Sequence, residues 1–184
     1  MDTKLITYAI PCYNSAEYMD ACIESILACN RPDDIEIIIV DDGSTKDNTL
    51  EKAQVWESTN PGVIRAIHQE NGGHGAAVMT GLENARGLYF KVVDSDDWLD
   101  NDANVAMLDK LASFDEPLDL MLVNYVYEHT ADNTQEVMKY TRMLPVEQLF
   151  TWDDCGHFGL TKYILMHSVI YRTQMLRDCG LTLP

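Results

Sequence analysis

Two short acidic clusters are the parts of this 184-residue chain best suited to chemistry. Residues 94–97 read DSDD and residues 41–44 read DDGS, and each cluster directly follows an apolar run. Carboxylates that are packed together repel one another, and the pKa of some of them rises unless they share a cation. Carboxylate oxygens suit Mg²⁺ and Mn²⁺, which keep open coordination positions for water and phosphates. The two clusters therefore predict a site for a divalent metal ion.

The cluster at 94–97 is the stronger half of this prediction. Residues i and i+2 at a strand end point the same way, so Asp94 and Asp96 can converge on one ion. The competing interpretation is a solvated acidic loop that caps the next helix, because a D-x-D pattern occurs often by chance. A calcium loop of the EF-hand type is disfavoured, since Trp98 occupies the third ligand position and no glycine follows it.

Other loops carry groups suited to a nucleotide. A carboxylate of Asp41 or Asp42 could accept a hydrogen bond from the imide N–H of uracil or hold a ribose hydroxyl, and Tyr13 could stack on a base. Residues 71–75 (NGGHG) lead into a helix, so their free N–H groups could approach a pyrophosphate. Each of these features also has a plain structural explanation, either as a turn or as packing.

The elements that position these loops alternate between strand and helix. The run 35–40 (IEIIIV) is almost wholly apolar and β-branched, which indicates a strand covered on both faces. Apolar residues at helical spacing begin at Met19, after an N-x-x-E capping box formed by Asn14 and Glu17. We expect strands over residues 4–10, 35–40, 63–68, 88–93 and 118–127, with helices over 19–27, 48–57, 76–86 and 105–112. This order predicts a Rossmann-like α/β fold with a mostly parallel sheet and helices on both faces.

The regular alternation ends near residue 127. Ligands bind beyond the carboxyl ends of the strands in an open parallel sheet, so residues 1–127 contain the binding loops. Beyond them we expect a hairpin between 123–127 and 137–143, a short helix at 146–150, an extended segment at 162–171 and a helix over 173–179. Because no linker separates the two parts, residues 128–184 are expected to pack on the same domain as an extension.

Composition narrows the range of functions. The chain has 13 Lys and Arg against 30 Asp and Glu, which gives a formal net charge of −17. This charge argues against nucleic acid and against an anionic membrane surface as partners, because both attract basic proteins. The five cysteines lack C-x-x-C spacing, and there is neither an apolar leader nor a run near the ~18 apolar residues of a membrane span. We therefore expect a reduced, soluble, cytoplasmic protein.

Three segments together resemble the inverting glycosyltransferases of family two, which have the GT-A fold. They are residues 10–14 (IPCYN), 38–45 (IIVDDGST) and 87–99 (GLYFKVVDSDDWL), and in this order and spacing they are highly specific. The resemblance runs from about residue 7 to residue 184. It implies a nucleotide-diphosphate sugar such as a UDP-sugar as donor, with Mn²⁺ or Mg²⁺ as cofactor. Residues 1–127 would then bind the donor, and residues 128–184 would form the acceptor side, itself incomplete.

The family motifs, with the loops described above, also give expected roles for single residues. Asp42 would contact the base, and Asp94 would lie near the ribose and the diphosphate. Asp96 would be the principal metal ligand beside Asp94, with Asp97 as a weaker candidate. The expected substrate-binding residues are Pro11, Tyr13, Asn14, Glu17, Asp41, Asp42, Gly73, Asp94 and Ser95.

The chain departs from the family pattern in two places. Residues 77–79 read AVM where the family often has Ala-Arg-Asn, so a basic side chain that could contact the diphosphate is missing and the metal carries more weight. The second departure concerns the family's catalytic base, a carboxylate in an acidic motif that follows a segment resembling residues 180–184. We expect this base beyond Pro184, in a chain that is truncated here. Asp153 and Asp154 are alternatives within the chain, but a surface or capping role fits them better.

The sequence thus predicts transfer of a sugar, with inversion, from a UDP-sugar or a related donor to a hydroxyl of a saccharide or lipid-linked acceptor. Such a reaction belongs to the synthesis of cell-surface polysaccharide or glycoconjugate. The alternative is a catalytically incomplete sugar-nucleotide-binding module. A sugar nucleotidyltransferase is less favoured, because residues 11–14 contain neither a glycine nor a basic residue. An oxidoreductase that uses a dinucleotide would need G-x-G-x-x-G at the same place.

Overall fold

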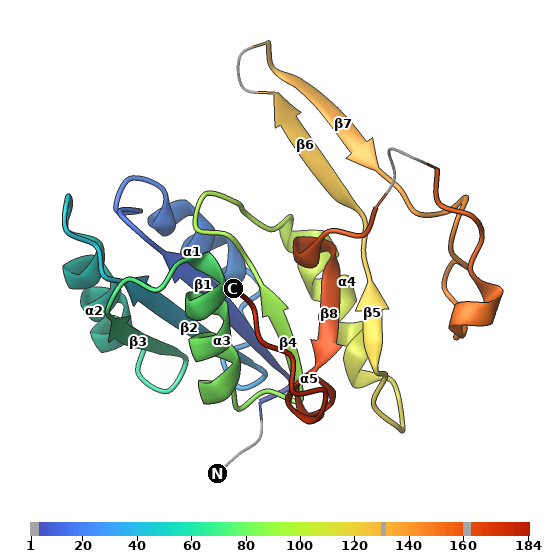
Figure 1. The fold of residues 1–184 in the computed structure, drawn as a ribbon, viewed down its shortest axis with the longest axis horizontal. Coiled ribbons are helices and arrows are strands. Elements are labelled where there is room, and N and C mark those ends of the chain that lie inside the picture. Colours follow the sequence, from blue (N-terminus) through green and yellow to red (C-terminus); the bar gives the residue numbers. More distant parts are fainter. Residues whose placement is uncertain (1–3, 130–131, 160–162) are drawn as a thin grey trace. The chain divides into compact units, whose positions relative to one another are not determined.

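The computed structural model describes residues 4–129, 132–159 and 163–184, and its strands and helices alternate along most of the chain (Figure 1). The chain divides into two compact units. The first contains residues up to Leu120 together with residues 170–184, and the second contains the described residues between 121 and 169. Among the described residues, no helix has both the length and the apolar character that crossing a membrane requires.

A six-stranded sheet has the strand order β3-β2-β1-β4-β8-β5. Strand β1 pairs in parallel with β2 and β4, and β2 pairs in parallel with β3, whereas β8 is antiparallel to β4. The strands are β1 (Ile6–Cys12), β2 (Ile35–Asp42), β3 (Ile64–Gln69), β4 (Tyr89–Val92), β5 (Leu120–Leu122) and β8 (Val169–Arg172). The mostly parallel α/β sheet predicted from the sequence is confirmed.

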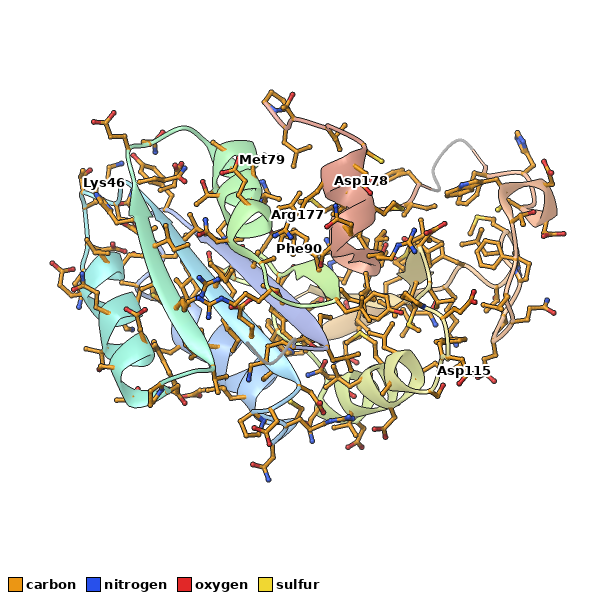
Figure 2. All side chains as sticks on the ribbon, turned by 90° about the horizontal axis from the view of Figure 1, so that it is seen from below. Lys46, Met79, Phe90, Asp115, Arg177 and Asp178 are labelled. Atoms are coloured by element: carbon orange, nitrogen blue, oxygen red, sulfur yellow. The ribbon has the colours of Figure 1, made fainter. Side chains whose placement is uncertain are left out.

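Helices cover both faces of the part of the sheet that lies in the first unit. The helices are α1 (Met19–Leu27), α2 (Thr49–Thr59), α3 (His74–Asn84), α4 (Asn101–Ala112) and α5 (Thr173–Asp178). Figure 2 shows α3 and α5 on one face and α1 and α4 on the other. Every residue of β1 and of β2 is buried as a result. This burial explains why the run at 35–40 is almost continuously apolar instead of alternating.

Helix α3 packs closely on β1 because a glycine faces the strand. A Cβ added at Gly81 would lie 2.7 Å from the Cβ of Ala9, closer than side chains normally pack. Just after Gly81, at the carboxyl end of α3, the Arg177 guanidinium of α5 donates to the carbonyl oxygens of Leu82 and Ala85, at 2.8 and 2.7 Å. These bonds satisfy backbone acceptors that a helix leaves unpaired at its carboxyl end.

The second unit contains a β-hairpin and a small apolar core of its own. Strands β6 (Tyr125–His129) and β7 (Thr134–Met138) are antiparallel, with Tyr125 opposite Met138. A hairpin therefore forms as expected, but its second strand lies at 134–138 and not at 137–143. Two short 3₁₀ helices follow, η1 (Trp152–Asp154) and η2 (Met166–Ser168). The core consists of Tyr140, Met143 and Leu144, with Leu122, Tyr125, Phe150, Cys155, Phe158 and Ile164 packed against them.

Two local predictions about this part of the chain were wrong. The single strand expected over 118–127 is interrupted, and the carboxamide oxygen of Asn124 accepts a bond from the Tyr140 N–H at the interruption, at 3.4 Å. No helix forms over 146–150; the nearest helical turn is η1, which begins at Trp152. Asp154 caps that turn, since its side chain accepts bonds from the N–H and hydroxyl of Thr151 at 2.8 and 3.1 Å. The capping role expected for Asp154 is therefore confirmed.

Candidate functional site

Asn14 ties the loop after β1 to the loop after β2. Its carboxamide oxygen accepts bonds from the backbone N–H groups of Thr45 and Lys46, at 3.1 and 2.9 Å. The backbone N–H of Asn14 donates to the Ser44 hydroxyl at 2.9 Å. Its φ of 52° lies in the left-handed region, which asparagine tolerates better than most residues. The predicted capping box is therefore wrong, because the Asn14 side chain is already used here. Helix α1 begins instead after Tyr18, without a side-chain cap.

Asp41 and Asp42, at the end of β2, are both buried and both hydrogen-bonded inside the protein. Asp41 Oδ2 lies 2.7 Å from Nδ1 of His68 on the neighbouring strand β3. Asp42 accepts three bonds, from the Gln69 side chain at 2.7 Å and from the backbone N–H groups of Gly72 and Gly73 at 2.8 and 2.9 Å. The two glycine N–H groups are thus not the free donors that the sequence suggested. Asp42 fixes the glycine loop to the end of β2.

Asp94 lies at the edge of the sheet in the loop after β4, where the histidine that begins α3 reaches it. Nε2 of His74 is 2.8 Å from Oδ1 of Asp94. The residue before His74 is Gly73, whose φ of 87° belongs to a region that side chains disfavour, so a glycine is needed there to start α3 in this direction. The loop after β3 and the loop after β4 are therefore joined through this histidine, a pairing for which the sequence held no signal.

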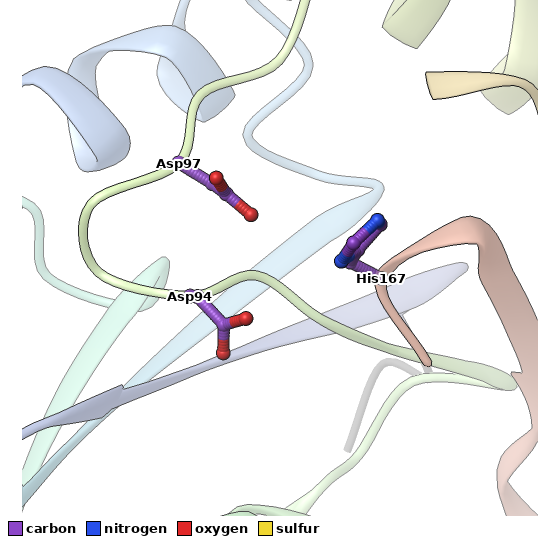
Figure 3. A group of neighbouring side chains, drawn as sticks. All are labelled: Asp94, Asp97 and His167. Atoms are coloured by element: carbon purple, nitrogen blue, oxygen red, sulfur yellow. The ribbon is translucent and has the colours of Figure 1, made fainter. Parts of the chain in front are cut away.

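The close carboxylates of this loop are Asp94 and Asp97, shown in Figure 3. Oxygens of these two side chains lie within 4.8 Å of one another, close enough to share a cation. The loop turns tightly here, since the Asp97 N–H donates to the Asp94 carbonyl at 2.9 Å. Strand β4 ends at Val92, so the alternation of side chains along a strand does not extend to Asp96. Asp96 is exposed, and among the described side chains it is not one of those that lie close enough to Asp94 and Asp97 to share a cation with them. Its role as a metal ligand stays a prediction.

A lysine lies buried in β4, just before these carboxylates. Lys91 is only 3% exposed, and burial lowers the pKa of its amine to about 8, while the charges of Asp97 and Asp94 act in the opposite direction. A buried ammonium so close to the acidic loop offsets part of its negative charge. Sequence reasoning missed this residue, although a lysine inside the apolar run YFKVV was a usable signal.

The remaining predicted residues differ in how they are placed. Ser95 donates to the Ser15 hydroxyl at 2.9 Å, which joins the loop after β4 to the loop after β1. Tyr13 is half exposed, so its ring is accessible to a planar ligand. Pro11 is buried within β1, and Glu17 is exposed just before α1. The hydrogen bonds thus bring Asn14, Asp42, Gly73, Asp94 and Ser95 into one connected rim, and they do not include Pro11, Glu17 or Asp96.

The mostly parallel sheet covered by helices on both faces matches the GT-A fold of glycosyltransferases. Residues 7–169 match the model of the family "Glycosyl transferase family 2". The chain belongs to this family, and the family resemblance proposed from its motifs is confirmed.

Known relatives extend well beyond the matched region. Over 159 residues the chain is 36% identical to the chondroitin synthase of Escherichia coli. This match covers 85% of this chain but only 22% of that protein. The chain spans half the length or less of the curated relatives it matches.

Solved structures agree with the fold. The crystal structure of S. aureus TarS 1-349 gives a TM-score of 0.70 at 23% identity, covering 97% of this chain and 50% of that one. Its complexes with UDP and with UDP-GlcNAc give TM-scores of 0.63 and 0.60, both at 22% identity, covering 97% of this chain and 50% and 48% of theirs. The mannosyltransferase PcManGT of Pyrobaculum calidifontis, in complex with GDP-Man and Mn²⁺, gives a TM-score of 0.51 at 27% identity. The match covers 56% of this chain and 31% of that one.

Proposed function

We propose that this glycosyltransferase takes its sugar from a UDP-linked donor held at the carboxyl edge of the sheet, with a divalent cation, and transfers it with inversion to a saccharide or lipid-linked hydroxyl. The observation that carries the proposal is the pair of carboxylates, Asp94 and Asp97, whose oxygens lie within 4.8 Å on the loop after β4. Related folds support the ligand classes, since TarS was solved with UDP and UDP-GlcNAc and PcManGT with Mn²⁺.

The chemistry of the donor set fits Mn²⁺ or Mg²⁺. Both ions prefer oxygen ligands and leave coordination positions for the oxygens of a substrate phosphate. Asp94 and Asp97 would hold the ion, with exposed Asp96 able to add a ligand. When bound, such an ion stabilises the negative charge of a departing diphosphate. Acidic residues outnumber basic ones by 30 to 13 in this chain, and Lys91 is buried in β4, so a bound cation would supply the positive charge for that purpose.

The other loops of the rim would position the nucleotide. The half-exposed ring of Tyr13 offers a flat apolar surface for a base. Asp42 keeps the glycine loop in place through its bonds from Gly72 and Gly73, so its contribution to binding is to shape the surface on which the ligand lies. In this arrangement the loops after β1, β2, β3 and β4 all contribute to one donor site.

Calorimetric titration with UDP, in the presence and absence of Mn²⁺, tests the proposal. We expect Mn²⁺ to tighten UDP binding at least tenfold in the wild-type protein and to have no such effect in Asp94→Ala. The matched control is Asp33→Ala, which removes one exposed carboxylate just before β2, at the opposite edge of the sheet, and should bind like the wild type. UDP binding that ignores Mn²⁺ would contradict the metal role, and absence of UDP binding would contradict the donor class.

A transfer assay separates an active enzyme from a module that only binds. Because the catalytic base is expected beyond Pro184, the assay uses the full-length protein. With a UDP-sugar, Mn²⁺ and a saccharide acceptor, we expect it to release UDP and to extend the acceptor, and both activities to be lost in Asp94→Ala. Tight binding of the UDP-sugar without any release of UDP would favour the binding-module alternative instead.

A further inference from the structure

Four tyrosines surround a small cavity at the base of the β6–β7 hairpin, entirely within the second unit. The cavity has a volume of about 80 Å³. Its lining residues are Tyr125, Tyr127, Met138, Lys139, Tyr140, Met143 and Tyr163. We refer to it as the tyrosine pocket. None of these residues belongs to the rim loops of the donor site.

The hairpin gathers aromatic rings on one of its faces. Tyr125 and Tyr127 are two residues apart on β6, so their side chains point to the same face, and Met138 lies directly opposite Tyr125 on β7. The rings of Tyr125 and Tyr127 pack edge to face, with centroids 5.2 Å apart and an angle of 84°. Tyr125 is also 6.4 Å from the ring of Tyr140, at 51°. Because these rings are not parallel, they form walls in different orientations.

The floor of the pocket is fixed by the core of the unit. Tyr140 and Met143 are each only 7% exposed. The Tyr140 hydroxyl lies 2.9 Å from the Ser168 hydroxyl, which in turn donates to the carbonyl of Leu165 at 2.6 Å. A ligand would therefore meet a surface that is already formed, and binding would lose little free energy to ordering the protein.

The mouth of the pocket combines aromatic rings with polar ends. Tyr127 is 39% exposed and Tyr163 is 59% exposed, so parts of both rings face solvent. Lys139 beside them is exposed and brings the only positive charge of the lining. Each tyrosine presents an apolar ring and a hydroxyl that can both donate and accept, and the ammonium adds three donors.

A pyranose ring has the complementary surface. One side of the ring carries apolar C–H groups that pack on an aromatic face, and its edge carries hydroxyls that pair with tyrosine hydroxyls and with an ammonium. The volume of about 80 Å³ suits part of one ring. It lies far below the roughly 300–1,000 Å³ of pockets that enclose larger ligands, so the pocket would hold a single ring and not a whole nucleoside diphosphate.

We propose that the tyrosine pocket binds a sugar ring of the saccharide acceptor. This inference rests on the proposed function, because it takes the acceptor to be a saccharide, and it adds the residues that would recognise it.

Saturation-transfer NMR with methyl β-D-glucopyranoside and methyl N-acetyl-β-D-glucosaminide tests the pocket directly. We expect transfer to at least one glycoside in the wild-type protein and an at least fivefold loss in Tyr127→Ala and in Tyr163→Ala. Tyr127→Phe keeps the ring and should retain most of the signal. The matched control is Trp152→Ala, since Trp152 is 64% exposed in the same unit but does not line the pocket.

Calorimetry with UDP and Mn²⁺ on the same variants separates this proposal from the proposed function. We expect UDP binding to be unchanged in Tyr127→Ala and Tyr163→Ala, and we expect their near-UV circular dichroism to show that the second unit keeps its packed core. Wild-type protein that binds UDP but neither glycoside, or alanine variants that keep the full glycoside signal, would overturn the assignment of the pocket. Glycoside binding without UDP binding would support the pocket and contradict the donor proposal.

Discussion

Nε2 of His74 lies 2.8 Å from Oδ1 of Asp94, and this contact joins the first residue of α3 to the acidic loop after β4. The His74 side chain is 53% exposed and that of Asp94 is 35% exposed. Exposed pairs of this kind contribute little to the free energy of unfolding. The consequence of the contact is therefore local: it restricts the orientation of a carboxylate that we propose as a metal ligand.

His74→Ala should weaken Mn²⁺-dependent binding of UDP without destabilising the protein. Removal of a residue that orients a metal ligand typically costs about tenfold or more in metal affinity. We expect a loss of about tenfold by calorimetry, and a change of less than about 0.5 kcal/mol in the free energy of unfolding measured with urea. His74→Gln retains a side-chain donor and should recover part of the affinity. Unchanged Mn²⁺ and UDP affinities in His74→Ala would show that Asp94 does not depend on this contact.

The strands and the acidic loops were predictable because their signals are local. The apolar run at 35–40 has no other good interpretation than a strand covered on both faces, and the parallel order then brings the loop at 41–44 and the loop at 94–97 to the same edge. The inference needs only the alternation of apolar runs with segments of helical spacing, and it does not need to know which side chains meet in three dimensions. The fold class and the edge that carries the candidate site follow from it.

The contacts inside the site were not predictable, because they join residues far apart in the chain. Asn14 matched a local capping pattern, yet its carboxamide pairs with Thr45 and Lys46 on another loop. Asp42 was expected to face a ligand, yet it accepts bonds from Gly72 and Gly73 about thirty residues later. A sequence gives the chemical type of such a side chain, but the choice among its partners depends on which loops meet in three dimensions.

Asp42→Asn should destabilise the protein and loosen the glycine loop. The carboxylate accepts three hydrogen bonds, from Gln69, Gly72 and Gly73, whereas an amide has one accepting oxygen and would turn its NH₂ toward a donor. Leaving buried donors unpaired costs about 2 kcal/mol in the free energy of unfolding, measured by urea denaturation. Asp33→Asn makes the same chemical change at an exposed position and should stay within about 0.5 kcal/mol of the wild type. Equal stabilities of the two variants would contradict the anchoring role of Asp42.

Lys91 should make stability depend on alkaline pH. Burial lowers the pKa of this lysine from its ordinary 10.5 to about 8 in the folded protein. Below pH 8 the folded state must therefore hold a buried charge that the unfolded chain holds in water, and this lowers stability. Between pH 8 and 10.5 the unfolded chain binds more protons at this group than the folded protein does, so the contribution of Lys91 to stability rises with pH.

Lys91→Met isolates this effect, because every other titrating group is common to both proteins. We expect the stability of the wild type relative to Lys91→Met to increase by about 2 kcal/mol between pH 7 and pH 10, measured by urea denaturation at each pH. Lys110→Met, at a lysine on the exposed side of α4, should show no such dependence. A constant difference between the wild type and Lys91→Met across this range would mean that Lys91 is not held in a desolvated position.

Gly87→Ala should disrupt the pairing of β1 with β4, which aligns the loops of the proposed donor site. A Cβ at Gly87 would lie 2.5 Å from the carbonyl carbon of Ile6 and 2.7 Å from the carbonyl oxygen of Tyr89, and it would also meet the backbone nitrogen of Thr7. These atoms belong to the backbone of paired strands, so they cannot move aside as a flexible side chain would. We expect a loss of about 3 kcal/mol in the free energy of unfolding, together with weaker binding of UDP. Gly159→Ala is the matched control, since no atom of the described residues lies within 4 Å of its added Cβ, and it should be neutral in both measurements. Wild-type stability in Gly87→Ala would show that β1 and β4 do not approach this closely at the base of the site.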